Sequence, residues 1–254
     1  MNTTDPRLNA FGRLLNIMDE LREKCPWDQK QSFESLRHLT IEETYELSDA
    51  ILKNDLNELK KELGDLMLHL VFYSKIASEI NAFDVSDVLN GICEKLISRH
   101  PHIYGQVEVN SAEDVKKNWE QLKLKEGNKS VLSGVPASLP ALVKASRMQD
   151  KAAQVGFDWP NIEPVWDKIE EEMQEFKEAK EANKEAEFGD ILFSLVNYAR
   201  WNNINPDDAL ERTNIKFKKR FEAIEAEAKA QGKSIQELSL AEMDEIWDKA
   251  KEKI

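Results

Sequence analysis

The segment DLNELKKELGDLMLHLVFYSKIASEI, Asp55 to Ile80, decides the fold class of this 254-residue chain. Its apolar residues recur every three or four positions, which is the spacing of one face of an α-helix. The same spacing runs through RLLNIMDELREK (13–24), VWDKIEEEMQEFKEAKEA (165–182) and most of the remaining chain. Strands are hard to place anywhere. The sequence therefore predicts an all-α protein.

Part of this segment is a nearly continuous apolar run, LMLHLVFYSKI at Leu66–Ile76, and a second such run, ILFSLVNYARW, lies at Ile191–Trp201. A helix that is apolar on most faces has to be enclosed on most sides. One helical hairpin cannot enclose it, so either two modules of one chain pack together or two chains do. We expect a homodimer built on these helices.

The composition limits the class of partner. The chain carries 35 Lys and Arg against 48 Asp and Glu, a net charge of -13, which disfavours binding to nucleic acid and to anionic membranes.

Cys25 and Cys93 are far apart and form no CxxC motif, so neither a disulfide framework nor a zinc site is indicated. No signal-peptide core or long apolar stretch occurs, and a cytoplasmic protein is expected.

The two halves of the chain resemble each other. EETYEL followed by KELGDLMLHLVFYSK matches EEMQEF followed by AEFGDILFSLVNYAR. Between the halves, EGNKSVLSGVPASL (126–139) holds two glycines and a proline between helical segments, which is typical of a connecting segment. We predict two related helical-bundle modules, 1–126 and 140–254, joined by a linker at 127–139.

Acidic residues recur at helical spacing in both modules. Residues three apart share a helix face, and a turn at Asn54 and Asp55 would bring the two acidic pairs of the first module to one height. The predicted clusters are Glu43, Glu46, Glu62 and Asp65, and Glu172, Glu175, Glu187 and Asp190. At about 5 Å and an effective dielectric near 20, each pair of carboxylates repels by roughly 3 kcal/mol.

Such a cluster must protonate, separate or bind cations, and oxygen ligands favour hard divalent ions. We expect Mg²⁺, with Mn²⁺ as the other candidate. A single copy arises readily by chance in so acidic a chain, but the second copy with the same spacing argues against a merely solvated acidic face.

A metal site on an acidic protein favours a substrate that contains phosphate, because Mg²⁺ can bridge phosphate oxygens. Lys216 and Arg220 lie at i and i+4, a spacing suited to holding a polyphosphate, and ordinary surface charge is the alternative. Trp247 is a candidate for stacking on a base, although a lone Trp on an amphipathic helix is more often core. The sequence contains no Glu-x-x-His motif and no phosphate-binding P-loop.

The repeated EExxE and ExxD motifs, together with CPWD (25–28), RHPHIYG (99–105) and VGFDW (155–159), closely resemble the MazG nucleoside triphosphate pyrophosphohydrolases. The resemblance covers almost the whole chain. It implies a tandem all-α enzyme, a hydrolase acting on acid anhydrides, which dimerises, binds ATP and other nucleotides, and uses Mg²⁺ to cleave NTPs and dNTPs between the α and β phosphates.

The resemblance also implies the site residues. The second module is implied to be the main catalytic one, with the metal ligands at the eight acidic positions named above. Glu171 is expected to position water or act as base. The implied nucleotide contacts are Lys123, Lys168, Glu171, Lys184, Lys216, Arg220 and Trp247. Lys184 is the nearest candidate for a lysine expected near the tip of the second hairpin, which is shorter than the first.

Two other hypotheses stay open on the sequence. In the first, only one module is catalytic, and the first module dimerises the chain or senses nucleotides. In the second, the chain is a non-catalytic acidic helical adaptor that recruits a basic partner. The preference among nucleotides is not encoded in any motif.

Overall fold

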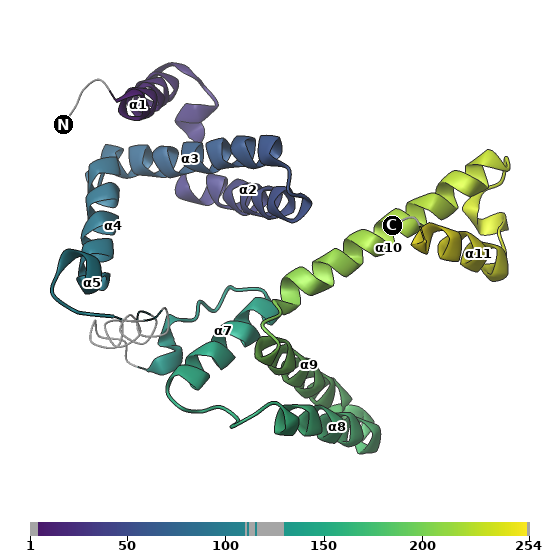
Figure 1. Cartoon of the computed structure of the whole chain (residues 1–254). Coiled ribbons are helices and arrows are strands. Elements are labelled where there is room, and N and C mark those ends of the chain that lie inside the picture. Colours follow the sequence, from purple (N-terminus) through teal and green to yellow (C-terminus); the bar gives the residue numbers. More distant parts are fainter. Residues whose placement is uncertain (1–4, 110, 112–114, 116–129, 253–254) are drawn as a thin grey trace. The chain divides into compact units, whose positions relative to one another are not determined.

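The computed structural model describes residues 5–109, 111, 115 and 130–252 (Figure 1). Within these residues every regular element is an α-helix or a 3-10 helix, so the predicted all-α class is confirmed. No helix in the described ranges has both the length and the apolar content needed to cross a bilayer.

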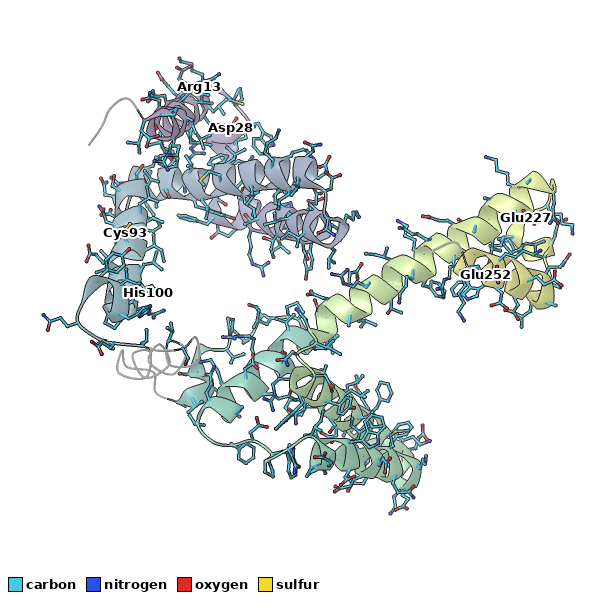
Figure 2. All side chains as sticks on the ribbon, viewed as in Figure 1. Arg13, Asp28, Cys93, His100, Glu227 and Glu252 are labelled. Carbon is cyan, nitrogen blue, oxygen red and sulfur yellow. The ribbon has the colours of Figure 1, made fainter. Side chains whose placement is uncertain are left out.

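The chain divides into two compact units, Met1–Val115 (unit 1) and Lys116–Ile254 (unit 2). The linker expected at 127–139 stays a prediction, because residues 116–129 lie outside the described part of the chain. Both cysteines, Cys25 and Cys93, are free thiols; Cys93 is exposed on α4 (Figure 2).

Unit 1 is built around a helical hairpin. Its elements are α1 (Pro6–Lys24), η1 (Asp28–Lys30), α2 (Phe33–Lys53), α3 (Leu56–Glu79), α4 (Val85–Arg99) and α5 (Pro101–Tyr104). The turn between α2 and α3 is tight because Asn54 adopts the left-handed conformation (φ 53°) that ends α2. Asp55 then caps α3 by accepting hydrogen bonds from the backbone N–H groups of Asn57 and Glu58. The predicted turn is therefore in place.

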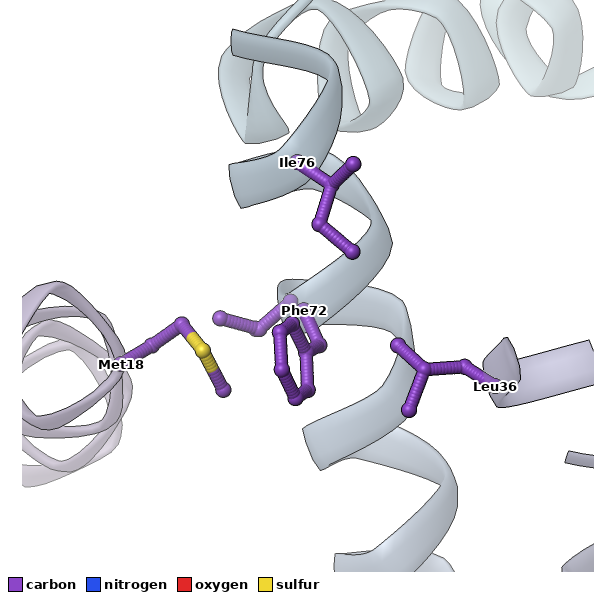
Figure 3. Packing of buried hydrophobic residues seen from close by; sticks show 5 residues of the cluster. Met18, Leu36, Phe72 and Ile76 are labelled. Atoms are coloured by element: carbon purple, nitrogen blue, oxygen red, sulfur yellow. The ribbon is translucent and has the colours of Figure 1, made fainter. Parts of the chain in front are cut away.

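The core of unit 1 lies where α1 and α2 meet α3. Met18 from α1, Leu36 from α2, and Phe72 and Ile76 from α3 point toward one another (Figure 3). Complete burial of such a side chain contributes about 1.5–3 kcal/mol relative to exposure. Elsewhere on α3, Leu63, Met67 and Leu70 are exposed within unit 1.

Unit 2 repeats the hairpin. Its elements are η2 (Val131–Gly134), α7 (Ala141–Gln154), α8 (Glu163–Glu178), η3 (Glu181–Asn183), α9 (Lys184–Trp201), α10 (Pro206–Ala230), η4 (Ile235–Glu237) and α11 (Leu240–Lys251). Helix α8 pairs with α9, and α7 packs against α9. Helix α10 continues to a separate small core with α11, around Ile224, Ala228 and Leu238.

Candidate functional site

In unit 1, three carboxylates come together across the hairpin. Glu43 lies on α2, and Glu62 and Asp65 lie on α3, one turn apart. One carboxylate oxygen from each residue lies within 4.8 Å of those from the other two. We call these three residues the first acidic triplet. Glu46, expected as a fourth member, is not part of this close group.

The carboxylates of the first acidic triplet are partly buried and repel one another. The Glu62 side chain is almost fully buried at 2% exposure. Its Oε1 lies 3.0 Å from the Lys61 ammonium, which holds the pKa of Glu62 below its usual range. Its buried Oε2 has no hydrogen-bond partner among the residues that the structure describes. Burial and the nearby charges of Asp65 and Glu46 raise the pKa of Glu43. A bound cation would neutralise the excess negative charge and would coordinate the unpaired oxygen of Glu62.

In unit 2 the same arrangement occurs. Glu172 on α8 meets Glu187 and Asp190 on α9, again with one oxygen from each within 4.8 Å of the others. We call these residues the second acidic triplet. Glu172 is buried at 6% exposure. Glu175 lies outside the close group, yet burial and the charge of Glu172 raise its pKa.

A lysine borders the second acidic triplet. The Lys168 Nζ lies 2.8 Å from Glu172 Oε1 and 2.9 Å from Glu171 Oε1, and these two bonds raise the pKa of Lys168. Residues 168, 171 and 172 share a face of α8 because they are three and four positions apart. The structure therefore joins Lys168 and Glu171, both predicted to contact the nucleotide, to the acidic cluster.

Four other predicted nucleotide contacts lie on α9, α10 and α11 rather than on α8. Lys184 begins α9 and pairs with Glu181 at 2.9 Å. The Arg220 guanidinium on α10 lies over the Trp247 ring on α11, 5.3 Å from its centre, and Lys216 is one turn before Arg220. Lys216, Arg220 and Trp247 are absent from the described lining of the pocket beside the second triplet. Lys123 lies outside the described residues.

That pocket adjoins the second acidic triplet in unit 2. It has a volume of about 620 Å³, and its wall includes Lys168, Glu172 and Asp190. The remaining wall comes from η2, α7, α9 and the segment before α8, and includes Gln149, Trp159 and Phe193. Sequence reasoning gave no role to these three residues. The VGFDW motif marked the segment that carries Trp159, whereas nothing local marked Gln149 or Phe193.

The comparisons with known proteins agree on one family. The profile of the MazG nucleotide pyrophosphohydrolase domain matches residues 31–104, which contain the first acidic triplet. The chain is 44% identical over 247 residues to the nucleoside triphosphate pyrophosphohydrolase/pyrophosphatase MazG of Thermotoga maritima, covering 95% of each protein.

The chain is also 40% identical over 257 residues to the nucleoside triphosphate pyrophosphohydrolase of Escherichia coli, covering 96% of this chain and 98% of the relative. The crystal structure of a mazG-related protein from Thermotoga maritima matches 44% of this chain and 98% of its own length, at 31% identity and a TM-score of 0.40. Identity of this extent over nearly the full length shows that the chain belongs to the MazG family.

Proposed function

We propose that this chain is a Mg²⁺-dependent nucleoside triphosphate pyrophosphohydrolase, which hydrolyses NTPs and dNTPs to a nucleoside monophosphate and pyrophosphate. One observation carries the proposal: the same carboxylate triplet is built on a helical hairpin in each unit, in a chain whose full-length relatives are named for this reaction. An acidic adaptor would need neither the convergence of these carboxylates nor their repetition.

The acidic residues fit a hard divalent cation. All the donors are carboxylate oxygens, which Mg²⁺ and Mn²⁺ prefer. The buried Oε2 of Glu62 has no other partner in the described structure. Glu172, Glu175, Glu187 and Asp190 would hold the metal in unit 2, and Glu43, Glu46, Glu62 and Asp65 in unit 1. When bound, Mg²⁺ supplies neutralising charge for the phosphates and lowers the pKa of a bound water.

The residues of α8 suggest how the substrate is handled. Glu171, next to the metal-ligand position Glu172, is suited to orienting or deprotonating the attacking water, since its carboxylate is exposed and adjoins the triplet. Water attacks the α phosphorus, the bond from this phosphorus to the bridging oxygen breaks, and pyrophosphate leaves. Lys168 is suited to neutralising charge on the phosphates.

Further contacts are proposed at Lys123, Lys184, Lys216, Arg220 and Trp247. For these residues the support is the sequence resemblance alone.

We also propose a homodimer. On α3, Leu63, Met67 and Leu70 are exposed, and on α8 and α9 so are Met173, Phe188, Leu192 and Leu195. Contiguous apolar surface of this kind is typical of protein interfaces. Light scattering at micromolar concentration tests this expectation: a mass near twice that of the chain supports it, and a monomer contradicts it.

The function is tested by steady-state kinetics on the four NTPs and four dNTPs with Mg²⁺, with the products separated. We expect a nucleoside monophosphate and pyrophosphate in equal amounts, and loss of turnover in EDTA. Release of a nucleoside diphosphate and orthophosphate would exclude the proposed bond. No turnover with any of the eight would favour the adaptor or nucleotide-sensing alternatives.

A further inference from the structure

A partly buried hydrogen-bond network joins the two helices of the unit 1 hairpin. Thr40 on α2 is at its centre, with its Oγ1 2.9 Å from His69 Nδ1 and 2.6 Å from the Tyr73 hydroxyl, both on α3. The same oxygen lies 3.0 Å from the backbone carbonyl of Leu36. The His69 side chain is in the hairpin interior, and the residue is only 7% exposed. We call Thr40, His69 and Tyr73 the hairpin network.

The proton positions in the hairpin network follow from the chemistry of its groups. A carbonyl oxygen only accepts, so the Thr40 hydroxyl donates its one proton to Leu36. His69 Nδ1 and the Tyr73 hydroxyl must then both donate to Thr40, which uses all the donor and acceptor positions of that hydroxyl. Burial lowers the pKa of His69, so its ring is neutral near pH 7 and adds no positive charge to its surroundings.

The hairpin network lies one helical turn from the first acidic triplet on both helices. Thr40 precedes Glu43 by three positions on α2, and His69 follows Asp65 by four positions on α3. Residues at these spacings share a helix face. The network therefore fixes the separation of α2 and α3 next to the layer in which the three carboxylates meet.

This fixed separation keeps an unpaired carboxylate oxygen in the protein interior. Glu62 is 2% exposed, and among the described residues it is the only carboxylate with a fully buried oxygen that has no hydrogen-bond partner. An unpaired buried charge is strongly unfavourable. The helices cannot separate to hydrate this oxygen without breaking the hairpin network, whereas a bound cation would coordinate it in place.

The hairpin of unit 2 does not contain this network. In the alignment of the two halves, Ile169 stands at the position of Thr40, and Ser194 at that of His69. Ile169 is buried at 2% exposure and has no hydroxyl to accept a hydrogen bond from α9. In the described structure, no oxygen of the second acidic triplet is fully buried without a partner. The second triplet therefore lacks both the polar connection between its helices and the unpaired buried oxygen.

We propose that the first acidic triplet is a preorganised site that takes up a divalent cation in the absence of nucleotide, with Thr40, His69 and Tyr73 as its positioning residues. The second acidic triplet takes up its cation together with the nucleotide. A site whose ligands are already ordered binds more tightly, because less conformational freedom is lost on binding. This inference rests on the proposed function, which assigns a cation to both triplets.

Mn²⁺ binding without nucleotide tests the order in which the two sites fill. Mn²⁺ is titrated into the full-length protein, and the free ion is measured from its EPR signal. The wild type and Glu172→Gln should bind Mn²⁺ equally tightly, and Glu62→Gln should bind it at least tenfold more weakly. The inference would be overturned by a wild type that binds no Mn²⁺, by unchanged binding in Glu62→Gln, or by an equal or larger loss in Glu172→Gln.

Variants of Thr40 test the positioning role. Thr40→Val removes the hydroxyl but keeps the shape, and should weaken nucleotide-free Mn²⁺ binding about tenfold, since groups that orient metal ligands typically account for 10–100-fold in affinity. Thr40→Ser keeps the hydroxyl and should bind within threefold of the wild type. Thr44→Val is the matched control, at an exposed position one turn further along α2, and should bind as the wild type does.

Two outcomes would contradict the positioning role: wild-type affinity in Thr40→Val, or binding in Thr40→Ser that is as weak as in Thr40→Val. Amide hydrogen exchange of α2 and α3 without Mn²⁺ identifies a variant that has lost its fold. If Thr40→Val does so, Tyr73→Phe decides, because it removes only the hydroxyl that donates to Thr40. A loss of at least threefold in Tyr73→Phe supports the role, and a smaller change contradicts it.

Failure of the proposed function is recognisable separately, from the release of pyrophosphate. A wild type that hydrolyses NTPs but takes up no Mn²⁺ without nucleotide would refute this inference and leave the function intact. A wild type that hydrolyses no NTP, yet binds Mn²⁺ in the pattern expected for the three proteins, would refute the function and leave the cation site of unit 1 supported.

Discussion

The Lys168 ammonium lies 2.8 Å from a carboxylate oxygen of Glu172, the buried member of the second acidic triplet that α8 contributes. This lysine therefore neutralises a carboxylate that we assign to the metal. Unit 1 has no lysine at the corresponding position of its hairpin, where Leu39 stands, and there Lys61 on α3 pairs with Glu62 instead. The two sites therefore differ in which helix supplies the lysine that pairs with the buried glutamate, which is α8 in unit 2 and α3 in unit 1.

Replacing Lys168 should separate metal binding from catalysis. In Lys168→Met, Glu172 loses its cationic partner, so Mg²⁺ should bind the free protein more tightly, by about threefold or more by calorimetry. The value of kcat/KM for NTPs should fall at least tenfold, because a charge on the phosphates is lost. Lys218→Met, which removes an exposed lysine on α10, should change neither quantity. Weaker Mg²⁺ binding in Lys168→Met would contradict this account.

Matched substitutions in the two triplets should show which unit catalyses. Glu172→Gln should lower kcat at least a hundredfold, since a lost metal ligand costs about 3 kcal/mol or more of transition-state stabilisation. If unit 2 is the main catalytic unit, Glu43→Gln should cost less than tenfold. Kinetics of both variants under saturating Mg²⁺ decide the question. A larger loss in Glu43→Gln than in Glu172→Gln would assign the chemistry to unit 1.

An ion pair in unit 1 should make stability depend on pH. Arg22 Nε donates to Glu79 Oε1 at 2.9 Å, joining α1 to the end of α3, and this bond lowers the pKa of Glu79. A carboxyl whose folded pKa is depressed stabilises the fold above its unfolded pKa of about 4.3, and the contribution is lost as the pH falls through the folded value. Glu79→Gln should therefore destabilise unit 1 by about 1 kcal/mol at pH 7.

As the pH falls through the lowered folded pKa of Glu79, Glu79→Gln and the wild type should converge, because Glu79 becomes protonated in both states. Hydrogen exchange of the α1 and α3 amides, read by mass spectrometry, reports on unit 1 alone. Glu20→Gln is the control, since Glu20 forms an exposed pair with Lys24 at 3.7 Å. An effect of Glu79→Gln that stays constant as the pH is lowered from 7 through the acid range would rule out the ion pair as its cause.

The sequence was enough to predict the features that depend on the spacing of residues along a single helix. The spacing of acidic residues along each helix, together with a turn at Asn54, was enough to predict that carboxylates from two helices meet. In each unit three of the four predicted carboxylates form the close group. Glu46 and Glu175, a turn further along their helices than Glu43 and Glu172, stay predicted ligands.

What the sequence could not predict depends on tertiary contacts. The hydrogen bond from Gln149 Nε2 to the backbone carbonyl of Phe193 joins residues 44 positions apart. The position of Arg220 is set by packing of α10 on Trp247 of α11, and no helical spacing relates that pair to the acidic triplet. Residues that share a helix face were thus placed correctly, whereas contacts between distant elements had to come from the structure.

The most direct test of the central claim is NTP hydrolysis in ¹⁸O-labelled water with Mg²⁺, with mass spectrometry of both products. The account predicts one ¹⁸O atom in the nucleoside monophosphate, unlabelled pyrophosphate, and loss of the reaction in Glu172→Gln. Label in pyrophosphate or in orthophosphate would contradict attack of water at the α phosphorus, and full activity of Glu172→Gln would contradict the role of the second acidic triplet in that reaction.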